Sequence, residues 1–197
     1  MKPQECALVV VDVQNDYCDD QGTFGKLGAQ LGAVQAAAER IVHLVEVARR
    51  AGVPVVWVKT HHDRSTNSPT WLARRTRKGL EICATDSWGA EFYRVKPAAD
   101  EIVVVKHRYS AFVGSKLEVV LRTLARSTLI FCGVTTNVCV ESTLRDAFMR
   151  DYDTVLAEDC AAAFTTAEHE GAVHNVRTYF GRVAGSATIE GLWATPQ

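Results

Sequence analysis

The sequence predicts one doubly wound α/β domain, with a six-stranded parallel sheet covered by helices on both faces. Three observations support this prediction. Short β-branched runs alternate with longer helical patterns along the chain, which implies right-handed β-α-β crossovers. The strong runs are continuously apolar, as strands buried on both faces are. The length of 197 residues suits one well-buried core but is short for two ordinary domains, so we take 1–197 as a single domain.

The expected strands follow one another in chain order. Five runs are strong, and a sixth, near the C-terminal end, is weaker. They span residues 6–12, 53–60, 101–106, 127–134, 153–159 and, for the weak one, 181–189.

Helical patterns fill the spaces between these runs. Residues 31–51 carry an apolar stripe at helical spacing, which Gly52 and Pro54 bring to an end. The remaining expected helices span 116–126, 137–150 and 166–180.

Residues 61–100 form an insert of a different kind. This stretch is polar, has weak periodicity and carries Trp71 and Trp88. So long an irregular segment inside a compact domain is usually a lid, a binding loop or an oligomer contact. The sequence leaves these three alternatives open.

Composition argues against several classes of protein. A formal net charge of −1 gives no electrostatic footprint for nucleic acid or for an anionic membrane surface. No apolar run approaches the roughly 20 residues of a membrane span. The N-terminal apolar run ends in an acid without a small-residue cleavage site, so we expect no signal peptide and a cytoplasmic location.

The cysteines are expected to be buried free thiols. Their even number is compatible with disulfides, but the chain is large and Cys6 and Cys132 lie inside apolar, strand-like runs. The absence of a CxxC pair argues against a structural zinc site and a thioredoxin-type centre. The six cysteines are Cys6, Cys18, Cys83, Cys132, Cys139 and Cys160.

Three chemically different groups come at the ends of expected strands. Asp12 closes the first strand, Lys106 closes the third, and Cys139 follows the fourth at the start of a helix. Ligands of open parallel sheets bind outside the carboxyl ends of the strands. Buried Asp and Lys are costly unless they pair. We therefore expect a carboxylate, an amine and a thiol at one edge of the sheet.

These three groups fit nucleophilic catalysis. A thiol attacks as the thiolate, and a free cysteine is largely protonated at neutral pH. Asp12 can accept the proton, while Lys106 can stabilise both the thiolate and the carboxylate. Thr136 is expected to be the N-cap of the following helix, and backbone N–H groups of Thr135 and Cys139 are candidates for an oxyanion hole.

Each group taken alone has a simpler explanation. A strand-end Asp often caps a loop, a Lys is often solvated, and a Cys at a helix start is often inert packing. Spacing alone therefore leaves both an enzyme and a non-catalytic binding protein open. A thiol redox protein is disfavoured because Cys139 lacks a resolving cysteine at short spacing.

Four sequence blocks resemble the isochorismatase-like cysteine hydrolases, and together they cover nearly the whole chain. The two later blocks are highly specific. The blocks are VVDVQNDYC (10–18), VVVKHRYSAF (103–112), FCGVTTNVCVESTLRDAFMRDY (131–152) and VLAEDCAA (155–162).

The resemblance implies a six-stranded parallel sheet of Rossmann-like order and an Asp12–Lys106–Cys139 catalytic triad. It also implies a cis peptide bond between Val134 and Thr135, a rare feature outside X-Pro bonds. The reaction it implies proceeds through a thioester, needs no cofactor and is carried out by a homodimer or homotetramer.

Within that family, KHRYSAF together with TTNVCVESTLRDAF looks most like the ureidoacrylate amidohydrolase branch, beside the biuret and N-carbamoyl hydrolases. The resemblance implies a small ureido or carbamoyl amide substrate. The alternatives are a nicotinamide-like or other primary amide, and a vinyl ether as in the isochorismatases proper. The latter chemistry does not need the thiol, so the presence of Cys139 disfavours it.

Five side chains are candidates for the substrate pocket. Asn15 and Tyr17 follow the first strand, Tyr109 and Phe112 follow the third, and Trp71 belongs to the insert. An aromatic wall suits a planar ureido group. Ordinary turn chemistry and core packing are the competing explanations.

Charged groups of the insert and of the helix expected at 137–150 have less specific interpretations. Four basic residues of the insert could clamp a substrate carboxylate, although a solvated basic face is the simpler reading. Glu141 and Arg145, four apart on a helix, are expected to form a supporting ion pair. The four basic residues are Arg74, Arg75, Arg77 and Lys78.

We expect no metal site. Metal-dependent nicotinamidases of this superfamily carry an Asp-x-His…His set after the second strand, whereas this chain has His61, His62 and Asp63 in a different order. Adjacent side chains on an extended segment point to opposite sides, so two neighbouring histidines do not easily share one metal.

Overall fold

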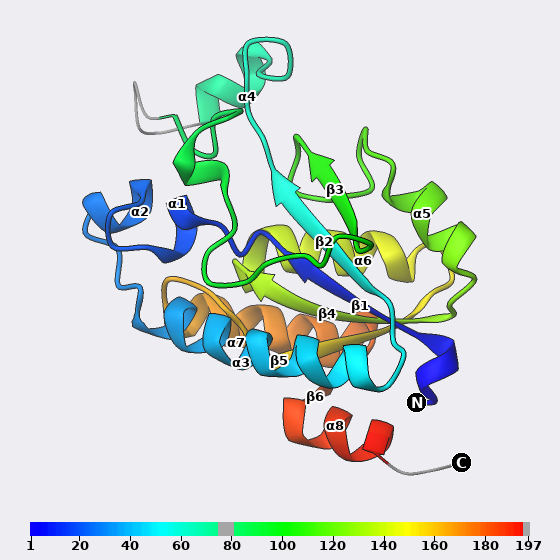
Figure 1. Ribbon diagram of the computed structural model, residues 1–197. Coiled ribbons are helices and arrows are strands. Elements are labelled where there is room, and N and C mark those ends of the chain that lie inside the picture. Colours follow the sequence, from blue (N-terminus) through cyan, green and yellow to red (C-terminus); the bar gives the residue numbers. More distant parts are fainter. Residues whose placement is uncertain (75–80, 195–197) are drawn as a thin grey trace.

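The protein, as a computed structural model, is described over residues 1–74 and 81–194, excluding the side chain of Arg74. Its described strands form one parallel sheet of order β3-β2-β1-β4-β5-β6 (Figure 1). This confirms the expected fold class. The strands are β1 (Cys6–Val11), β2 (Val55–Thr60), β3 (Ile102–Lys106), β4 (Thr128–Val134), β5 (Asp153–Ala162) and β6 (Arg182–Ala184).

Long helices connect the strands, and short helical turns occupy the loops. The longer helices are α3 (Gly32–Arg50), α5 (Leu117–Leu124), α6 (Glu141–Phe148), α7 (Thr166–Asn175) and α8 (Ser186–Ala194). The shorter ones are η1 (Pro3–Glu5), α1 (Asn15–Cys18), α2 (Thr23–Lys26), α4 (Pro69–Arg74), η2 (Trp88–Ala90) and the π-helical turns η3 (Thr136–Val140) and η4 (Val176–Phe180).

The sheet separates two hydrophobic clusters, which explains why its strands are continuously apolar. Successive side chains of β1 point to opposite faces: Leu8 joins the cluster under α3 and α8, while Val9 joins the cluster under α5 and α6. Both side chains are fully buried. Each strand residue therefore packs into one core or the other.

The strand order reverses between β1 and β4, the position where doubly wound sheets bind ligands. At this point Gly133 has a φ of 121°, and a Cβ built on it would lie 2.0 Å from the carbonyl oxygen of Val11. Only glycine fits this approach. The two strands thus come together directly before the loops that carry Asp12 and Cys139.

The last expected strand is wrong over most of its length. Only Arg182–Ala184 is extended, and α8 begins at Ser186. The carboxylate of Asp159 accepts hydrogen bonds from the Ser186 nitrogen at 2.7 Å and from its Oγ at 2.6 Å, which stabilises the start of a helix. Ile189 is then buried against the sheet from α8.

Two expected helices prove to be composite. The segment expected as 137–150 opens with η3 before α6, and the segment expected as 166–180 closes with η4 after α7. Hydrophobic periodicity does not separate a π turn from an α turn. Such π turns occur often at functional sites.

Hydrogen bonds attach the described parts of the insert to residues that follow β1. Gln14 pairs with Phe92 in an isolated antiparallel bridge. The buried carboxylate of Asp16 accepts hydrogen bonds from the Cys83 nitrogen at 2.6 Å and the Thr23 nitrogen at 2.9 Å. The segment therefore packs over the carboxyl ends of β1 and β2, and its function as lid or interface stays a prediction.

The state of the cysteines and the character of the helices complete the description of the fold. All six cysteines are buried free thiols, as expected. None of the helices in residues 1–74 and 81–194 is long and apolar enough to span a bilayer.

Candidate active site

The three strand-end groups expected from the sequence meet in the structure. Lys106 ends β3, and its Nζ lies 2.7 Å from Oδ2 of Asp12 and 3.4 Å from Sγ of Cys139. Asp12 follows β1 and Cys139 lies in η3, after β4. The exposed fractions of Asp12, Lys106 and Cys139 are 0%, 1% and 5%.

Thr60, which the sequence analysis did not single out, completes the hydrogen bonding of this cluster. Its hydroxyl accepts a hydrogen bond from Lys106 Nζ at 2.6 Å and donates to the Asp12 carboxylate, whose oxygens are both 3.1 Å away. Lys106 also donates to the carbonyl oxygen of Arg108 at 3.0 Å. The buried ion pair is therefore well satisfied. Thr60 ends β2, so the rule that identified Lys106 at the end of β3 would also have found it.

Gln14 fixes the loop after β1. Its side-chain oxygen accepts from the Thr60 nitrogen at 2.8 Å, while its Nε2 donates to the carbonyl oxygens of Thr60 at 2.9 Å and Ala90 at 2.8 Å. Asp12 itself has a φ of 52°, in the left-handed region that aspartate tolerates better than most residues. The hydrogen bonds of the buried Gln14 amide thus hold the loop in which Asp12 has this uncommon conformation.

Burial raises the pKa of the Cys139 thiol well above its ordinary value, against the opposing effect of the Lys106 ammonium, and the Asp12 charge adds to the rise. Burial alone would lower the pKa of Lys106, but Asp12 and then Cys139 outweigh it, so the Lys106 pKa is raised. The resting site thus holds a neutral thiol and an ammonium, and the thiol needs a base to lose its proton.

The loop that carries Cys139 begins at a cis peptide bond between Val134 and Thr135. The carbonyl oxygen of Thr135 accepts from the nitrogens of Val138 at 3.2 Å and Val140 at 3.3 Å, which closes the π turn. Thr135 and Cys139 both line one small cavity. The two segments expected to provide an oxyanion hole therefore border the same space.

Thr136 is not the side-chain N-cap that the sequence indicated. Its hydroxyl instead lies 2.9 Å from Nδ1 of His169 on α7, and Thr135 occupies the cap position of η3. The π turn moves the start of the helix by one residue, which displaces the expected cap. The Glu141–Arg145 pair forms as expected, with Arg145 Nε 3.0 Å from Oε1 of Glu141.

The cavity beside Cys139 has a volume of about 230 Å³ and is largely aromatic. Tyr17, Trp71 and Tyr109, three of the five side chains expected there, line it. This volume is smaller than that of most ligand pockets, so the cavity suits a small molecule.

The other two expected pocket residues do not line the cavity. Asn15 turns toward η2, where its Nδ2 donates to the carbonyl oxygen of Trp88 at 2.8 Å. Phe112 packs in the core, with the guanidinium carbon of Arg150 4.5 Å from its ring centre. Asn15 and Phe112 each contact a neighbouring residue outside the cavity. Their positions near strand ends did not indicate these contacts.

Several lining residues were missed by sequence reasoning. Phe24 reaches the cavity from α2, Asn137 from η3 and Glu168 from α7, while His62 and Ile82 belong to the insert. Asn137 was recoverable, because it lies two residues before Cys139. Phe24 and Glu168 depend on tertiary packing that the chain pattern does not show.

The described residues contain no group of three or more His, Cys, Asp or Glu side chains positioned for a metal ion. Of the two adjacent histidines, His62 lines the cavity whereas His61 does not. The Arg74 side chain and Arg75, Arg77 and Lys78 lie outside the described residues.

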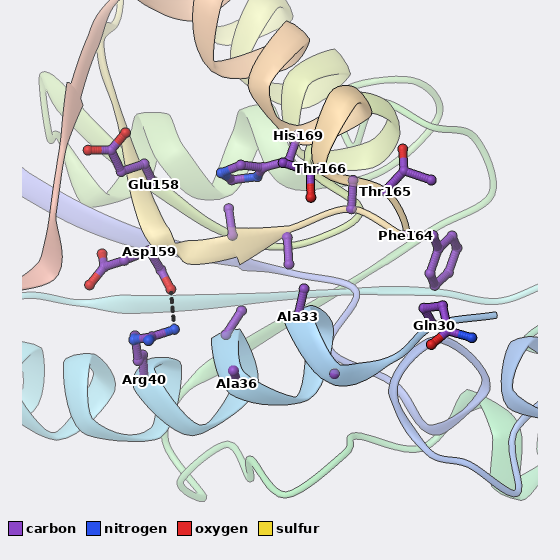
Figure 2. Close-up of a pocket in the computed structure, with 15 residues that line it drawn as sticks. Gln30, Ala33, Ala36, Arg40, Glu158, Asp159, Phe164, Thr165, Thr166 and His169 are labelled. Carbon is purple, nitrogen blue, oxygen red and sulfur yellow. Dashed lines mark hydrogen bonds between the residues drawn. The ribbon is translucent and has the colours of Figure 1, made fainter.

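A larger groove of about 470 Å³ lies between α3 and α7 (Figure 2). It is lined mostly by small side chains such as Ala33 and Ala36, with Arg40 donating to the Asp159 carbonyl oxygen at 3.5 Å. Asp12, Lys106 and Cys139 do not border it. The smaller cavity, which contains Cys139, is therefore the candidate active site.

Sequence comparison agrees with this geometry. The family model described as the isochorismatase domain matches residues 6–188. This chain belongs to the isochorismatase family.

Three individual proteins are similar to this chain over most of its length. Ureidoacrylate amidohydrolase RutB of Methylobacterium radiotolerans is 34% identical, with 100% of this chain and 82% of the relative covered. The solved structure of a cysteine hydrolase from Pseudomonas syringae pv. phaseolicola superposes with a TM-score of 0.87 at 26% identity, covering 98% of this chain and 94% of that one. N-carbamoylsarcosine amidase from Thermoplasma acidophilum superposes with a TM-score of 0.73 at 28% identity, covering 92% and 96%.

Proposed function

We propose that this isochorismatase-family hydrolase is a cysteine amidohydrolase that cleaves the C–N bond of a small ureido or carbamoyl amide. The observation that carries the proposal is the contact of Lys106 Nζ with both Asp12 and Cys139, beside a small aromatic cavity. The named amidohydrolase relatives, at 34% to 35% identity, support the substrate class.

The first half-reaction forms a thioester. Asp12 takes the proton from Cys139 as the sulfur attacks the substrate carbonyl carbon. Lys106, which remains protonated, stabilises the charge that develops on both partners. Backbone N–H groups of Thr135 and Cys139 are assigned to the oxyanion, a type of donor whose loss typically costs about 3–4 kcal/mol at the transition state.

The first half-reaction ends when Asp12 returns the proton to the departing nitrogen, so that the C–N bond breaks, ammonia or an amine leaves and the thioester remains on Cys139. The second half-reaction releases the acyl group. Asp12 removes a proton from a water molecule that attacks the thioester carbon. Asp12 then gives this proton to the sulfur as the C–S bond breaks, which regenerates the thiol and yields a carbamate or another carboxylic product.

The proposal is tested by ammonia release from a panel of ureido acids, biuret-like compounds, N-carbamoyl amino acids and nicotinamide. We expect turnover of at least one ureido or carbamoyl compound. Cys139→Ala is expected to lower the rate to the blank, because it removes the nucleophile without adding bulk. Release at or below the Cys139→Ala level for every compound would sink the proposal.

The same assay tests the expectation that no cofactor is needed. The proposed steps use only groups of the protein and a water molecule, so full activity should remain after exhaustive chelation. Loss of activity that added zinc restores would contradict the cofactor-free mechanism, while leaving the substrate class unaffected.

A further inference from the structure

Aromatic rings line the cavity in two groups. In the first, the rings are stacked: the centres of Tyr17 and Phe24 are 5.5 Å apart, and those of Phe24 and Phe164 are 4.6 Å apart. In the second, the tilted rings of Trp71 and Tyr109 have centres 4.8 Å apart. All five rings border the cavity. The faces of such rings carry negative potential, which attracts cations.

Glu168 adds a carboxylate to this cavity. It stands in the first turn of α7, where Thr165 accepts from its nitrogen at 3.3 Å and donates to its Oε2 at 2.9 Å. Thr165 thus caps the N-terminus of α7 through its side chain, and its hydroxyl also fixes the position of the carboxylate. Its second oxygen, Oε1, accepts no hydrogen bond from the described residues and is available to a ligand.

Nearby cations in the described part of the chain are already engaged. Lys106 is neutralised by Asp12 beneath the cavity. Arg108 donates to the carbonyl oxygens of Thr66 at 2.9 Å and His107 at 2.6 Å. Its guanidinium carbon lies 5.1 Å from the centre of the Trp71 ring, and Arg108 does not itself line the cavity, which leaves the Tyr17, Phe24 and Phe164 rings for a ligand cation. Among residues 1–74 and 81–194, Glu168 is the only Asp, Glu, Lys or Arg that borders the cavity.

We propose that the substrate carries a positive charge, such as an ammonium group, at the end away from the scissile bond, and that Glu168 is the specificity residue that recognises it. This rests on the proposed function and names its substrate more narrowly. The thiol receives the carbamoyl carbon, the rings enclose the chain, and the cationic end lies among the rings beside Glu168. A carboxylate end would instead face a fixed negative charge.

This substrate differs from the one in the relatives' name, because ureidoacrylate carries a carboxylate. Three ureas of matched length separate the alternatives: (2-aminoethyl)urea is cationic, propylurea neutral and 3-ureidopropionate anionic. Their affinities are measured by calorimetry with the Cys139→Ala protein, in which binding is separated from turnover.

We expect the cation to bind about tenfold more tightly than the anion, with propylurea between them, as the combined attraction of ring faces and one partly solvated carboxylate allows. Glu168→Gln in the same background should weaken binding of the cation about fivefold and leave that of propylurea unchanged, since the glutamine side-chain oxygen can still accept from the Thr165 hydroxyl. Glu170→Gln, an exposed residue two positions along α7 that does not line the cavity, is the matched control and should change neither.

Tightest binding of 3-ureidopropionate, equal weakening of all three ureas by Glu168→Gln, or no detectable binding of any urea would overturn the inference. The basic residues of 74–78 would be the first explanation to examine if the anion binds best. These results do not bear on ammonia release by the wild-type enzyme, so failure of this inference and failure of the proposed function are distinguishable.

Discussion

At the residue scale, one buried hydroxyl connects the two charges of the candidate site. Thr60 lies between Lys106 and Asp12, accepting from the first and donating to the second. It thereby fixes the orientation of the carboxylate that must receive the thiol proton. Removing one partner of a buried polar group typically costs about 1–3 kcal/mol.

Thr60→Val is therefore expected to lower kcat by about tenfold to a hundredfold, because it keeps the side-chain shape but leaves Asp12 and Lys106 without their shared partner. Thr60→Ser should retain most activity. Steady-state kinetics on a substrate found in the panel provides the measurement. Thr123→Val, on the exposed side of α5, is the control and should match the wild type. A wild-type kcat for Thr60→Val would contradict this role.

At the element scale, the sequence predicted the strands far better than the loops between them. Every strong run became a strand with ends within three residues of those expected, because continuous β-branched burial is a local signal. The meeting of Asp12, Lys106 and Cys139 at one edge followed from strand ends for the same reason, whereas their catalytic roles were implied by the family resemblance and stay a proposal. Thr136 and Phe112 were misplaced because a π turn and a core contact depend on neighbours distant in sequence.

Gly133→Ala tests the close contact of β1 and β4. An added Cβ would meet the Val11 carbonyl oxygen, and the positive φ disfavours alanine, so we expect a loss of at least about 2–3 kcal/mol in the free energy of unfolding. Gly171→Ala, with open space around a Cβ on α7, should instead be neutral or gain about 0.5–1 kcal/mol. Urea denaturation compares the two, and equal stability would refute the packing argument.

At the scale of the whole molecule, buried thiols couple stability to pH. Burial raises the pKa of Cys18, Cys83 and Cys132, each from an ordinary value of 9.0. In the unfolded chain these thiols ionise near pH 9, while the folded protein retains their protons. The unfolded state then binds fewer protons, so alkaline conditions favour it.

We therefore expect the free energy of unfolding to fall progressively as pH rises above about 9, by up to about 1.4 kcal/mol per pH unit for each such thiol. Lys106, whose pKa is also raised, adds to the loss at still higher pH. Urea unfolding between pH 7 and 10 in a reducing buffer measures the slope. Cys132→Ala should show a shallower slope than the wild type; identical slopes, or constant stability to pH 10, would contradict this.

The central claim is that Cys139 carries the acyl group between the two half-reactions. Acid-quenched turnover mixtures, digested and measured by mass spectrometry, test it directly. The account predicts a mass increase equal to the acyl group on the peptide that contains Cys139, lost after the substrate is consumed. Continued turnover by Cys139→Ala, or an acyl group found only on another residue, would contradict it.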